Sequence, residues 1–457
     1  MAERLMVSVS GVRGTIGETL TPQVAMEFGL AFAAMLGAGR KVAMGRDTRR
    51  SGEMIAAALS AGLLAGGVDV IDLGVVTTPG AALMTRKLAC DGGVIVTASH
   101  NPPKYNGIKF LQPIGVGLTF DGAAELKRLW ESRQFSLMPT ERVGRASRDD
   151  RTHDEHLAAV CEVCDVPAVA ARRFKVVVDC INGAGCIVTP RLLECLGCET
   201  ILLNDEPTGE FAHTPEPIEE NLAGLCRAVR EHGADVGFAQ DPDADRLVVV
   251  AEGGRFIGEE YTLALAAAFV LRHRKGKLAT NLATSRMIDD VAAAAGAEVV
   301  RAPTGEANVV EAMQREGCFF AGEGNGGVIE PRVVPVRNSL VGMAYLLQYM
   351  AETGKPLGEL AAEIPAYVML KTKFPAPAGV APRVAAETKK HFAARPGARF
   401  DERDGLRVDL PEAWVSVRAS NTEPIMRIMA EARDRAAAEA LVAETRKLAD
   451  AVIGGRK

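Results

Sequence analysis

The sequence predicts an α/β protein of four domains around a central cleft: three related α/β/α sandwiches followed by an α+β domain. The chain has 457 residues, which at about 150 residues per domain gives about three domains, with two or four within range. A strand–helix–strand pattern recurs three times, and a polar or glycine-rich loop follows each copy after one further strand. The expected domains are 1–150, 151–255, 256–368 and 369–457.

The charge balance and the apolar pattern exclude several classes of partner. Lys and Arg number 53 against 58 Asp and Glu, a net charge of −5, which offers no basic surface for a nucleic acid. No apolar run approaches the roughly 20 residues that cross a bilayer, and the N-terminus lacks the apolar core of a signal peptide. We therefore expect a cytoplasmic protein that binds neither nucleic acid nor membranes. Monomer and homodimer both remain open.

The three repeat copies share one order of elements. Each has an apolar strand, a polar turn, a helix closed by glycine and a second strand, at 40–74, 173–205 and 276–305. Glycine suits the left-handed position that commonly follows a helix. A short helical crossover between two strands implies a parallel pair in a right-handed unit.

One further strand follows each unit and ends in a loop, at 92–103, 234–246 and 317–328. Continuous apolar strands fit a sheet that is covered on both faces. Ligands of such sheets bind beyond the carboxyl ends of the strands, so each domain presents one loop at an equivalent place. The C-terminal part lacks the unit but offers a fourth loop within 415–432, then an Ala-rich helix from about 434 to 453.

The first loop, TASHNPPKYNGIK, contains Ser99 and His100, with Lys109 further on. A serine can carry a phosphoryl group when its neighbours supply positive charge and hydrogen-bond donors. The loop lacks the Gly-x-Ser-x-Gly motif of serine hydrolases. The alternative is an Asn-Pro turn after a buried strand.

The second loop, DPDADR, carries Asp241, Asp243 and Asp245. Three carboxylates so close together would repel one another without a cation, and all-oxygen ligands suit Mg²⁺. A calcium-binding EF-hand is disfavoured because Arg246 stands where its loop requires glycine. Solvated aspartates in a turn are the remaining alternative.

The third and fourth loops carry groups that suit a sugar and a phosphate. A carboxylate and an amide, Glu323 and Asn325, have the acceptors and donors for two vicinal sugar hydroxyls, although a plain glycine-rich turn is an equal alternative. The fourth loop has the guanidinium, hydroxyl and amide donors that suit a phosphate dianion, or else a capped turn: Arg418, Ser420, Asn421, Thr422 and Arg427.

Two CxxC pairs, Cys161/Cys164 and Cys195/Cys198, raise the alternative of a zinc site. A zinc ribbon usually places its two pairs about 15–20 residues apart. The gap here is about twice that, and both pairs fall at expected helix ends. We therefore expect small buried thiols instead of a metal site.

The motifs TASHNPP and DPDADR, with the other two loops in this order, resemble the α-D-phosphohexomutase superfamily over the whole chain. The segment SGVRGTIG resembles that family's opening segment, and Arg13 matches its active-site arginine. The resemblance implies mixed sheets in the three sandwiches and an enzyme that interconverts hexose 1-phosphates and hexose 6-phosphates.

The resemblance also implies roles for particular residues. Ser99 would be phosphorylated, Mg²⁺ would be held by the three aspartates and an oxygen on Ser99, and the reaction would pass through a bisphosphorylated sugar. Hexose 1,6-bisphosphate would act as the activator. His100 and Lys109 would serve proton transfer and phosphate stabilisation, and Arg13 and Arg246 would neutralise the phosphoserine.

The preferred sugar is less well defined by the resemblance. Several family members have Gly-Glu-x-Ser-Gly-His in the sugar loop, whereas this chain has Asn325 and Gly327, which resembles the archaeal-type branch. Glucosamine, glucose and mannose phosphates are all candidate substrates, and Glu306 beside a cationic 2-amino group would favour glucosamine phosphate. The competing functions are a Mg²⁺-dependent phosphatase with Asp241 as nucleophile and a non-catalytic sugar-phosphate sensor.

Overall fold

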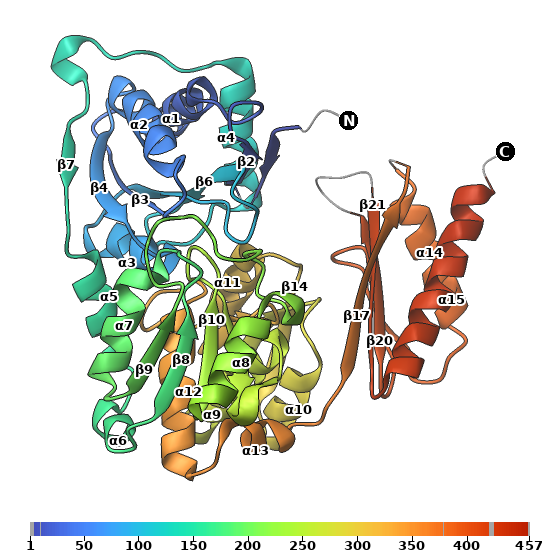
Figure 1. Ribbon diagram of the computed structural model, residues 1–457. Helices are drawn as coiled ribbons and strands as arrows, with labels where there is room; N and C mark the ends of the chain where they lie inside the picture. The colour runs from blue at the N-terminus through green and yellow to red at the C-terminus, as the bar shows by residue number, and fades with distance from the viewer. Residues whose placement is uncertain (1–3, 10, 378, 420–424, 456–457) are drawn as a thin grey trace.

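The computed structural model describes residues 4–9, 11–377, 379–419 and 425–455. These residues form four sheets, and domains I to IV are the successive parts of the chain that contain them (Figure 1). The expected fold class, three α/β/α sandwiches with mixed sheets and a C-terminal α+β domain, is confirmed. None of the helices in the described ranges is both long and apolar enough to cross a membrane.

Domain I has a seven-stranded sheet in the order β1-β2-β6-β5-β3-β4-β7. Helices α1 and α2 pack closely on one face of this sheet. Gly62 permits the close approach, because a Cβ at this position would lie only 2.1 Å from the carbonyl oxygen of Met26. The elements are β1 (Met6–Ser8), β2 (Gly11–Thr15), α1 (Pro22–Leu36), β3 (Lys41–Arg46), α2 (Gly52–Ala65), β4 (Asp69–Val75), α3 (Thr78–Lys87), β5 (Gly92–Val96), β6 (Tyr105–Leu111), α4 (Phe120–Ser132), the 3₁₀ turn η1 (Thr140–Arg142) and β7 (Ala146–Arg148).

Domain II has a five-stranded sheet in the order β12-β11-β10-β8-β9. Its elements, with the two helices that lead into it, are α5 (Thr152–Cys161), α6 (Val166–Ala170), β8 (Lys175–Asp179), α7 (Gly185–Cys195), β9 (Glu199–Leu203), η2 (Glu219–Asn221), α8 (Ala223–His232), β10 (Val236–Gln240), β11 (Leu247–Ala251), η3 (Glu252–Gly254) and β12 (Arg255–Phe256).

Domain III has a four-stranded sheet in the order β14-β13-β15-β16. Its elements are α9 (Glu259–His273), β13 (Lys277–Asn281), α10 (Met287–Ala294), β14 (Glu298–Ala302), α11 (Glu306–Arg315), β15 (Phe320–Glu323), β16 (Gly327–Ile329), α12 (Ser339–Thr353) and α13 (Leu357–Ala362).

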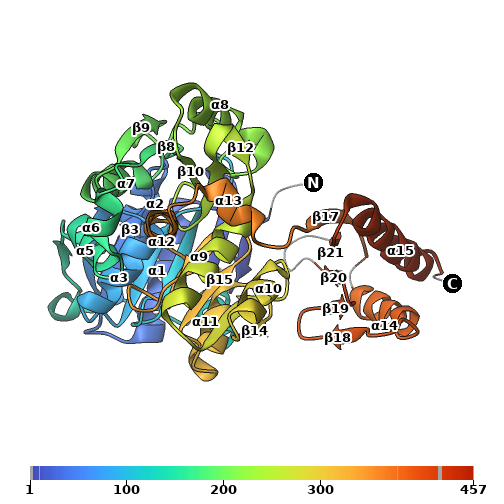
Figure 2. The same ribbon diagram turned by 90° about the horizontal axis from the view of Figure 1, so that it is seen from below.

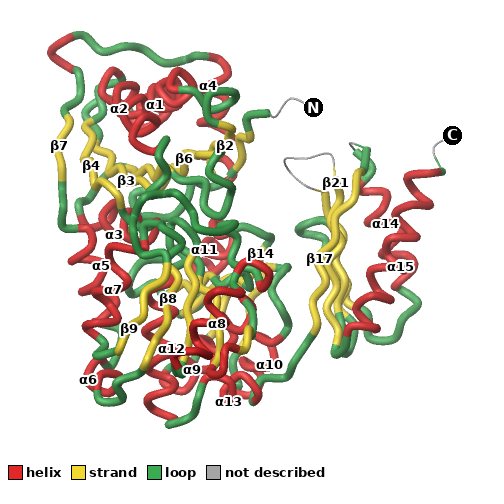
Figure 3. The backbone as a smooth tube through the Cα atoms, viewed as in Figure 1, coloured by secondary structure: helices red, strands yellow, loops and turns green. Residues whose placement is uncertain are grey.

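The three sandwiches repeat one strand arrangement, as the sequence predicts. In each, the two strands of the repeat unit pair in parallel, and the following strand pairs in parallel on the other side of the first. An antiparallel strand then pairs with that one. The three loops therefore connect β5 to β6, β10 to β11 and β15 to β16, at equivalent corners of the three sheets. Figure 3 shows loops of domains I to III gathered between the sheet of domain I and the two sheets below it.

Domain IV is a five-stranded antiparallel sheet in the order β17-β21-β20-β19-β18, covered by two helices. Its elements are β17 (Val368–Pro375), α14 (Ala381–Phe392), β18 (Arg399–Asp401), β19 (Leu406–Asp409), β20 (Trp414–Ala419), β21 (Ile425–Ala432) and α15 (Arg435–Gly454).

The buried cores separate domain IV from the rest. One apolar cluster continues from α3 through the sheet of domain II to α9 and α12, whereas domain IV has a core of its own. Figures 1 and 2 both show domain IV beside the other three domains, with β17 leading into it. Polar contacts join it to domain III, including hydrogen bonds from Arg286 N to Glu431 and from Arg407 to the carbonyl of Leu282.

Candidate active site

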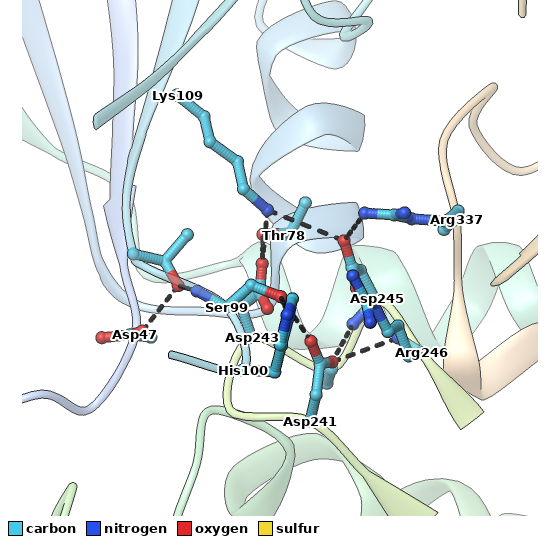
Figure 4. Close-up of polar contacts among 12 residues, drawn as sticks. Asp47, Thr78, Ser99, His100, Lys109, Asp241, Asp243, Asp245, Arg246 and Arg337 are labelled. Atoms are coloured by element: carbon cyan, nitrogen blue, oxygen red, sulfur yellow. Dashed lines mark hydrogen bonds and ion pairs between the residues drawn. The ribbon is translucent and has the colours of Figure 1, made fainter. Parts of the chain in front are cut away.

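Ser99 lies in the turn between β5 and β6 with its side chain buried against domain II. Its hydroxyl donates to Oδ2 of Asp241 over 2.6 Å (Figure 4). The backbone φ of Ser99 is +49°, in the left-handed region that residues other than glycine seldom adopt. Such backbone is found at functional sites where the surroundings hold it in place. The two loops that the sequence singled out for phosphoryl and metal chemistry thus meet at this serine.

Arg49, which the sequence analysis did not identify, holds the turn around Ser99. It is buried, and all five N–H groups of its guanidinium are used. Nε donates to Asp47, and the two Nη atoms donate to backbone carbonyls of the turn, including that of Ser99 at 2.5 Å. The available signal was the polar turn GRDTRRSG, at the end of β3. The turn follows β3, which pairs with β5 in the sheet, so a side chain from it can reach the Ser99 turn that follows β5.

The three aspartates are buried together after β10. Each offers one carboxylate oxygen, and these atoms lie within 4.8 Å of one another. Oδ1 of Asp241 accepts from the backbone N of Asp245 and of Arg246 at 3.1 Å. Within the described ranges, Oδ1 of Asp243 and Oδ1 of Asp245 have no hydrogen-bond partner. Buried carboxylate oxygens that converge without donors suit a hard divalent cation.

The second oxygens of these carboxylates are held by cations and a hydroxyl. Oδ2 of Asp243 accepts from Oγ1 of Thr78 at 2.5 Å and from Nζ of Lys109 at 2.7 Å. Oδ2 of Asp245 accepts from Nη2 of Arg337 at 2.5 Å. The repulsion expected among the aspartates is therefore offset within the chain, and each donor also fixes the direction of the free oxygen.

The charges around Ser99 set the protonation of its neighbours. Burial lowers the pKa of Lys109, but Asp243 and Asp245 outweigh burial, so its pKa is raised and the ammonium stays charged. Burial, together with the charges of Arg246 and Arg13, lowers the pKa of His100 to about 2. The imidazole is therefore neutral at physiological pH, with Nδ1 3.4 Å from the Ser99 hydroxyl.

Arg13, on β2, and Arg246, in the loop before β11, add two guanidiniums to this group. Nη1 of Arg13 donates to Oδ1 of Asn101 at 2.8 Å, next to the Ser99 turn. Nε of Arg246 lies 3.8 Å from Oδ1 of Asp245. Burial lowers the pKa of Arg13, and the charge of Asp243 opposes that effect. The two guanidiniums thus border the serine and the aspartates, where a phosphate would need positive charge.

The sugar-loop residues lie at the equivalent corner of domain III. Oε1 of Glu323 accepts from Asn281 at 2.7 Å and Oε2 accepts from Arg337 at 2.6 Å, while Asn325 lies 3.4 Å from the same carboxylate. Gly326 has φ +84°, and a Cβ there would lie 2.3 Å from the carbonyl oxygen of Leu247. This close approach presses the sugar loop against the strand that follows the aspartates.

The phosphate loop is only partly described, because Ser420, Asn421 and Thr422 lie outside the described residues. Arg418 and Arg427 are cross-strand neighbours on β20 and β21. Arg418 pairs with Asp404 at 3.7 Å. Within the described part of the chain, no hydrogen bond or ion pair joins Arg418 or Arg427 to the Ser99 turn or the aspartates.

The CxxC cysteines do not converge on one point. Cys161 Sγ lies 3.4 Å from Cys195 Sγ, whereas Cys164 and Cys198 turn to the backbone carbonyls of Ala344 and Leu196. The expectation of buried thiols is wrong for all four, because Cys161, Cys164 and Cys198 are partly exposed and Cys195 is exposed. This residue ends α7, where the following glycine turns the chain towards β9.

His156, on α5, links three parts of the chain behind the aspartates. Its Nε2 lies 2.9 Å from Nδ2 of Asn338, and its Nδ1 lies 3.3 Å from Oγ1 of Thr77. The amide oxygen of Asn338 accepts from backbone N–H groups of α12, so its NH₂ group faces the ring. Nε2 therefore accepts a hydrogen bond, and the neutral ring stabilises this junction next to Thr78 and Asp243.

Acidification is expected to weaken the His156 junction. Burial lowers the pKa of His156 to about 4, against about 6.5 in an unfolded chain. Because the unfolded state takes up the proton first, stability is unaffected above about pH 6.5 and falls as the pH drops to about 4, by about 3 kcal/mol. Urea midpoints of wild type and His156→Gln at pH 7.5 and pH 4 test this. The wild type should lose more stability, and equal losses would contradict the assignment.

The four-domain fold and the buried serine beside three aspartates define an enzyme class, the phosphohexomutases. Models of the phosphoglucomutase/phosphomannomutase α/β/α domains I, II and III match residues 4–136, 154–254 and 258–367, and the model of the C-terminal domain matches residues 371–448. The chain therefore belongs to the phosphoglucomutase/phosphomannomutase family, which confirms the resemblance.

Individual relatives agree over nearly the whole chain. A phosphoglucomutase/phosphomannomutase of Thermococcus kodakarensis is 42% identical over 93% of both chains. A probable phosphoglucosamine mutase of Methanopyrus kandleri is 39% identical over 94% of this chain and 95% of the relative. The crystal structure of a family protein from Burkholderia thailandensis superimposes with a TM-score of 0.86 at 29% identity, over 99% of both chains.

Proposed function

We propose that Ser99 carries the phosphoryl group of a hexose-phosphate mutase. Phosphorylated Ser99 gives its phosphoryl group to the free hydroxyl of a hexose 1- or 6-phosphate. The bisphosphorylated sugar turns over in the site and returns its other phosphoryl group to Ser99. The observation that carries the proposal is the 2.6 Å hydrogen bond between Ser99 and Asp241, beside two buried carboxylate oxygens that have no hydrogen-bond partner among the described residues.

Mg²⁺ would be held by the three aspartates, Asp241, Asp243 and Asp245, and by an oxygen on Ser99. When bound, the ion neutralises charge that develops on the transferring phosphoryl group. Lys109 stays protonated and donates to phosphoryl oxygens. The neutral ring of His100 orients the serine oxygen. Phosphoryl transfer with a loose transition state needs little proton abstraction, which suits a site whose histidine is a weak base.

Glucosamine phosphate is the substrate that we propose for this site, ahead of glucose and mannose phosphates. One guanidinium, Arg337, serves three carboxylates, those of Asp245, Glu306 and Glu323. Lys109 and Arg246 also lie near Asp245, whereas among the described residues Glu306 and Glu323 share Arg337 as their one ion-pair partner. Negative charge is therefore in excess at these two carboxylates, which favours a cationic 2-amino group. Glu306 itself is engaged by Arg337, so the preference comes from the group of carboxylates and not from Glu306 alone.

Parallel assays with glucosamine, glucose and mannose phosphates test both parts of the proposal. Hexose 1,6-bisphosphate is added as the activator that restores phosphate to Ser99, and phosphopeptide mass spectrometry follows the phosphorylated serine. We expect mutase turnover with the highest kcat/KM for glucosamine phosphate. A higher kcat/KM for glucose phosphate would overturn the sugar preference. Turnover without any phosphate on Ser99 would overturn the mechanism.

Arg418→Ala is expected to raise KM for the 1-phosphate and the 6-phosphate alike. The substrate must bind in two orientations, and one phosphate site in domain IV would hold whichever phosphate is not reacting. Loss of a charge-assisted hydrogen bond costs about 1.5–3 kcal/mol, roughly ten- to a hundred-fold in affinity. Initial rates in both directions measure the effect, with Arg399→Ala on the edge strand β18 as the control. A rise for one isomer only would show that the site is not shared.

A further inference from the structure

Arg337 connects the aspartate cluster to the sugar loop. It lies just before α12 and is largely shielded from solvent, with 12% of its side chain exposed. Nη2 donates to Oδ2 of Asp245 at 2.5 Å, and Nη1 donates to Oε2 of Glu323 at 2.6 Å. The third carboxylate, that of Glu306, lies 3.1 Å from Nε and accepts from the backbone N of Arg337 at 3.0 Å. The two Nη atoms of one planar guanidinium thus contact the aspartate loop of domain II and the sugar loop of domain III. Figure 4 shows the contact with Asp245.

On the aspartate side, this contact determines where Asp245 points. Oδ2 is taken by Arg337, while the buried Oδ1 has no hydrogen-bond partner within the described ranges. A carboxylate held through one oxygen by a fixed donor keeps its other oxygen aimed at the cluster. Residues that orient metal ligands in this way typically change metal affinity 10- to 100-fold when they are replaced.

On the sugar side, the same guanidinium fixes Glu323. Asn281 holds Oε1 and Arg337 holds Oε2, so the carboxylate is fixed in plane by one donor on each side. Among the described residues, no hydrogen bond joins the Asn281 side chain to the aspartates, and Thr78 donates to Asp243 but not to Glu323. Arg337 therefore has a property that these two neighbours lack, a direct contact with both sets of carboxylates.

We propose that Arg337 is a positioning residue that sets the cation-binding aspartates and the sugar-binding carboxylate together, so that the metal and sugar sites depend on one side chain. The proposal rests on the proposed function in assigning Asp245 to the cation and Glu323 to the sugar. A lysine cannot replace the arginine, because its single ammonium lacks a fork that spans Asp245 and Glu323.

Two separate titrations without turnover test the proposal. Calorimetry with MgCl₂ alone measures the metal site, and calorimetry with glucose 1-phosphate in EDTA measures the sugar site, at a phosphorylation state of Ser99 matched by intact mass. Arg337→Gln should weaken both affinities at least about ten-fold. Asn281→Ala should weaken only the sugar affinity, and Thr78→Val only the Mg²⁺ affinity.

The outcomes separate this inference from the proposed function. If the wild type binds neither Mg²⁺ nor the sugar phosphate, the proposed function fails. If the wild type binds both and Arg337→Gln leaves either affinity unchanged, the positioning role is overturned. Arg337→Lys keeps a positive charge among the three carboxylates and so guards against misfolding of the glutamine variant. This lysine variant should still lose at least one affinity about ten-fold, and wild-type values for both would also overturn the proposal.

Discussion

Ser99→Ala is expected to reduce mutase turnover by about 10⁴-fold or more while leaving the protein folded. The hydroxyl is the only group in the site proposed to carry the phosphoryl group, and loss of a covalent relay is among the largest single-residue effects in enzymes. Alanine accepts the same backbone as serine at φ +49°, so the change removes one hydrogen bond to Asp241 and little packing. Turnover of glucosamine 6-phosphate and the thermal melting curve measure the two parts of the expectation.

The matched control for this variant is Ser132→Ala. Ser132 is exposed on α4, and its hydroxyl donates to the backbone carbonyls of Arg128 and Leu129 in its own helix. Wild-type turnover in the control, with near-complete loss at position 99, would assign the effect to the Ser99 hydroxyl. Retained turnover in Ser99→Ala would mean that another group receives the phosphoryl group, and Asp241 would then be the first residue to test as a nucleophile.

The sequence predicted the sandwiches because their signals are local. The strand, turn, helix and glycine of each repeat unit lie within about 35 residues. The hydrophobic periodicity and the glycine at the helix end are therefore enough to predict the parallel strand pair. The place of each loop followed from the same repeat. The extra strands β1, β2 and β7 at the edges of the first sheet are short and lie outside the repeat, so periodicity gave no signal for them.

The contacts among the loops were not predictable in this way. Arg49 reaches the carbonyl of Ser99 across 50 positions, and Arg337 reaches Asp245 across 92. Neither belongs to a motif with a fixed spacing, and each acts through a neighbour. Isolated charged residues in a sequence are usually solvated. Only the packing of the three sandwiches shows that Arg49 is buried among backbone carbonyls and that Arg337 lies among carboxylates.

The charge balance of the three aspartates differs between what the sequence predicts and what the structure shows. The sequence predicts that the three neighbouring carboxylates repel one another unless a cation is bound. In the structure, Lys109 and Arg337 already neutralise much of that repulsion from outside the cluster. The aspartates therefore contribute favourable contacts to the cation-free protein, in addition to the mutual repulsion that the sequence predicts.

Asp243→Ala is expected to abolish Mg²⁺-dependent turnover and also to destabilise the protein without metal. Loss of a ligand that helps stabilise transition-state charge corresponds to several kcal/mol, about 10³-fold or more in rate. Lys109 would lose its 2.7 Å partner and, among the described residues, would keep Asp245 at 3.6 Å as its one ion-pair partner. Removing one partner of a buried ion pair costs about 3 kcal/mol or more. Turnover against Mg²⁺ concentration and urea unfolding in EDTA measure the two losses.

Asp243→Asn separates the two losses. Its amide keeps the volume and one acceptor for Thr78 and Lys109 but removes the charge that a cation requires. This variant should lose turnover almost as completely as the alanine variant, and it should lose less stability in EDTA. A cation-free Asp243→Ala protein more stable than the wild type would show that repulsion among the aspartates dominates over their contacts with Lys109. Unchanged Mg²⁺ dependence of turnover in either variant would remove Asp243 from the metal site.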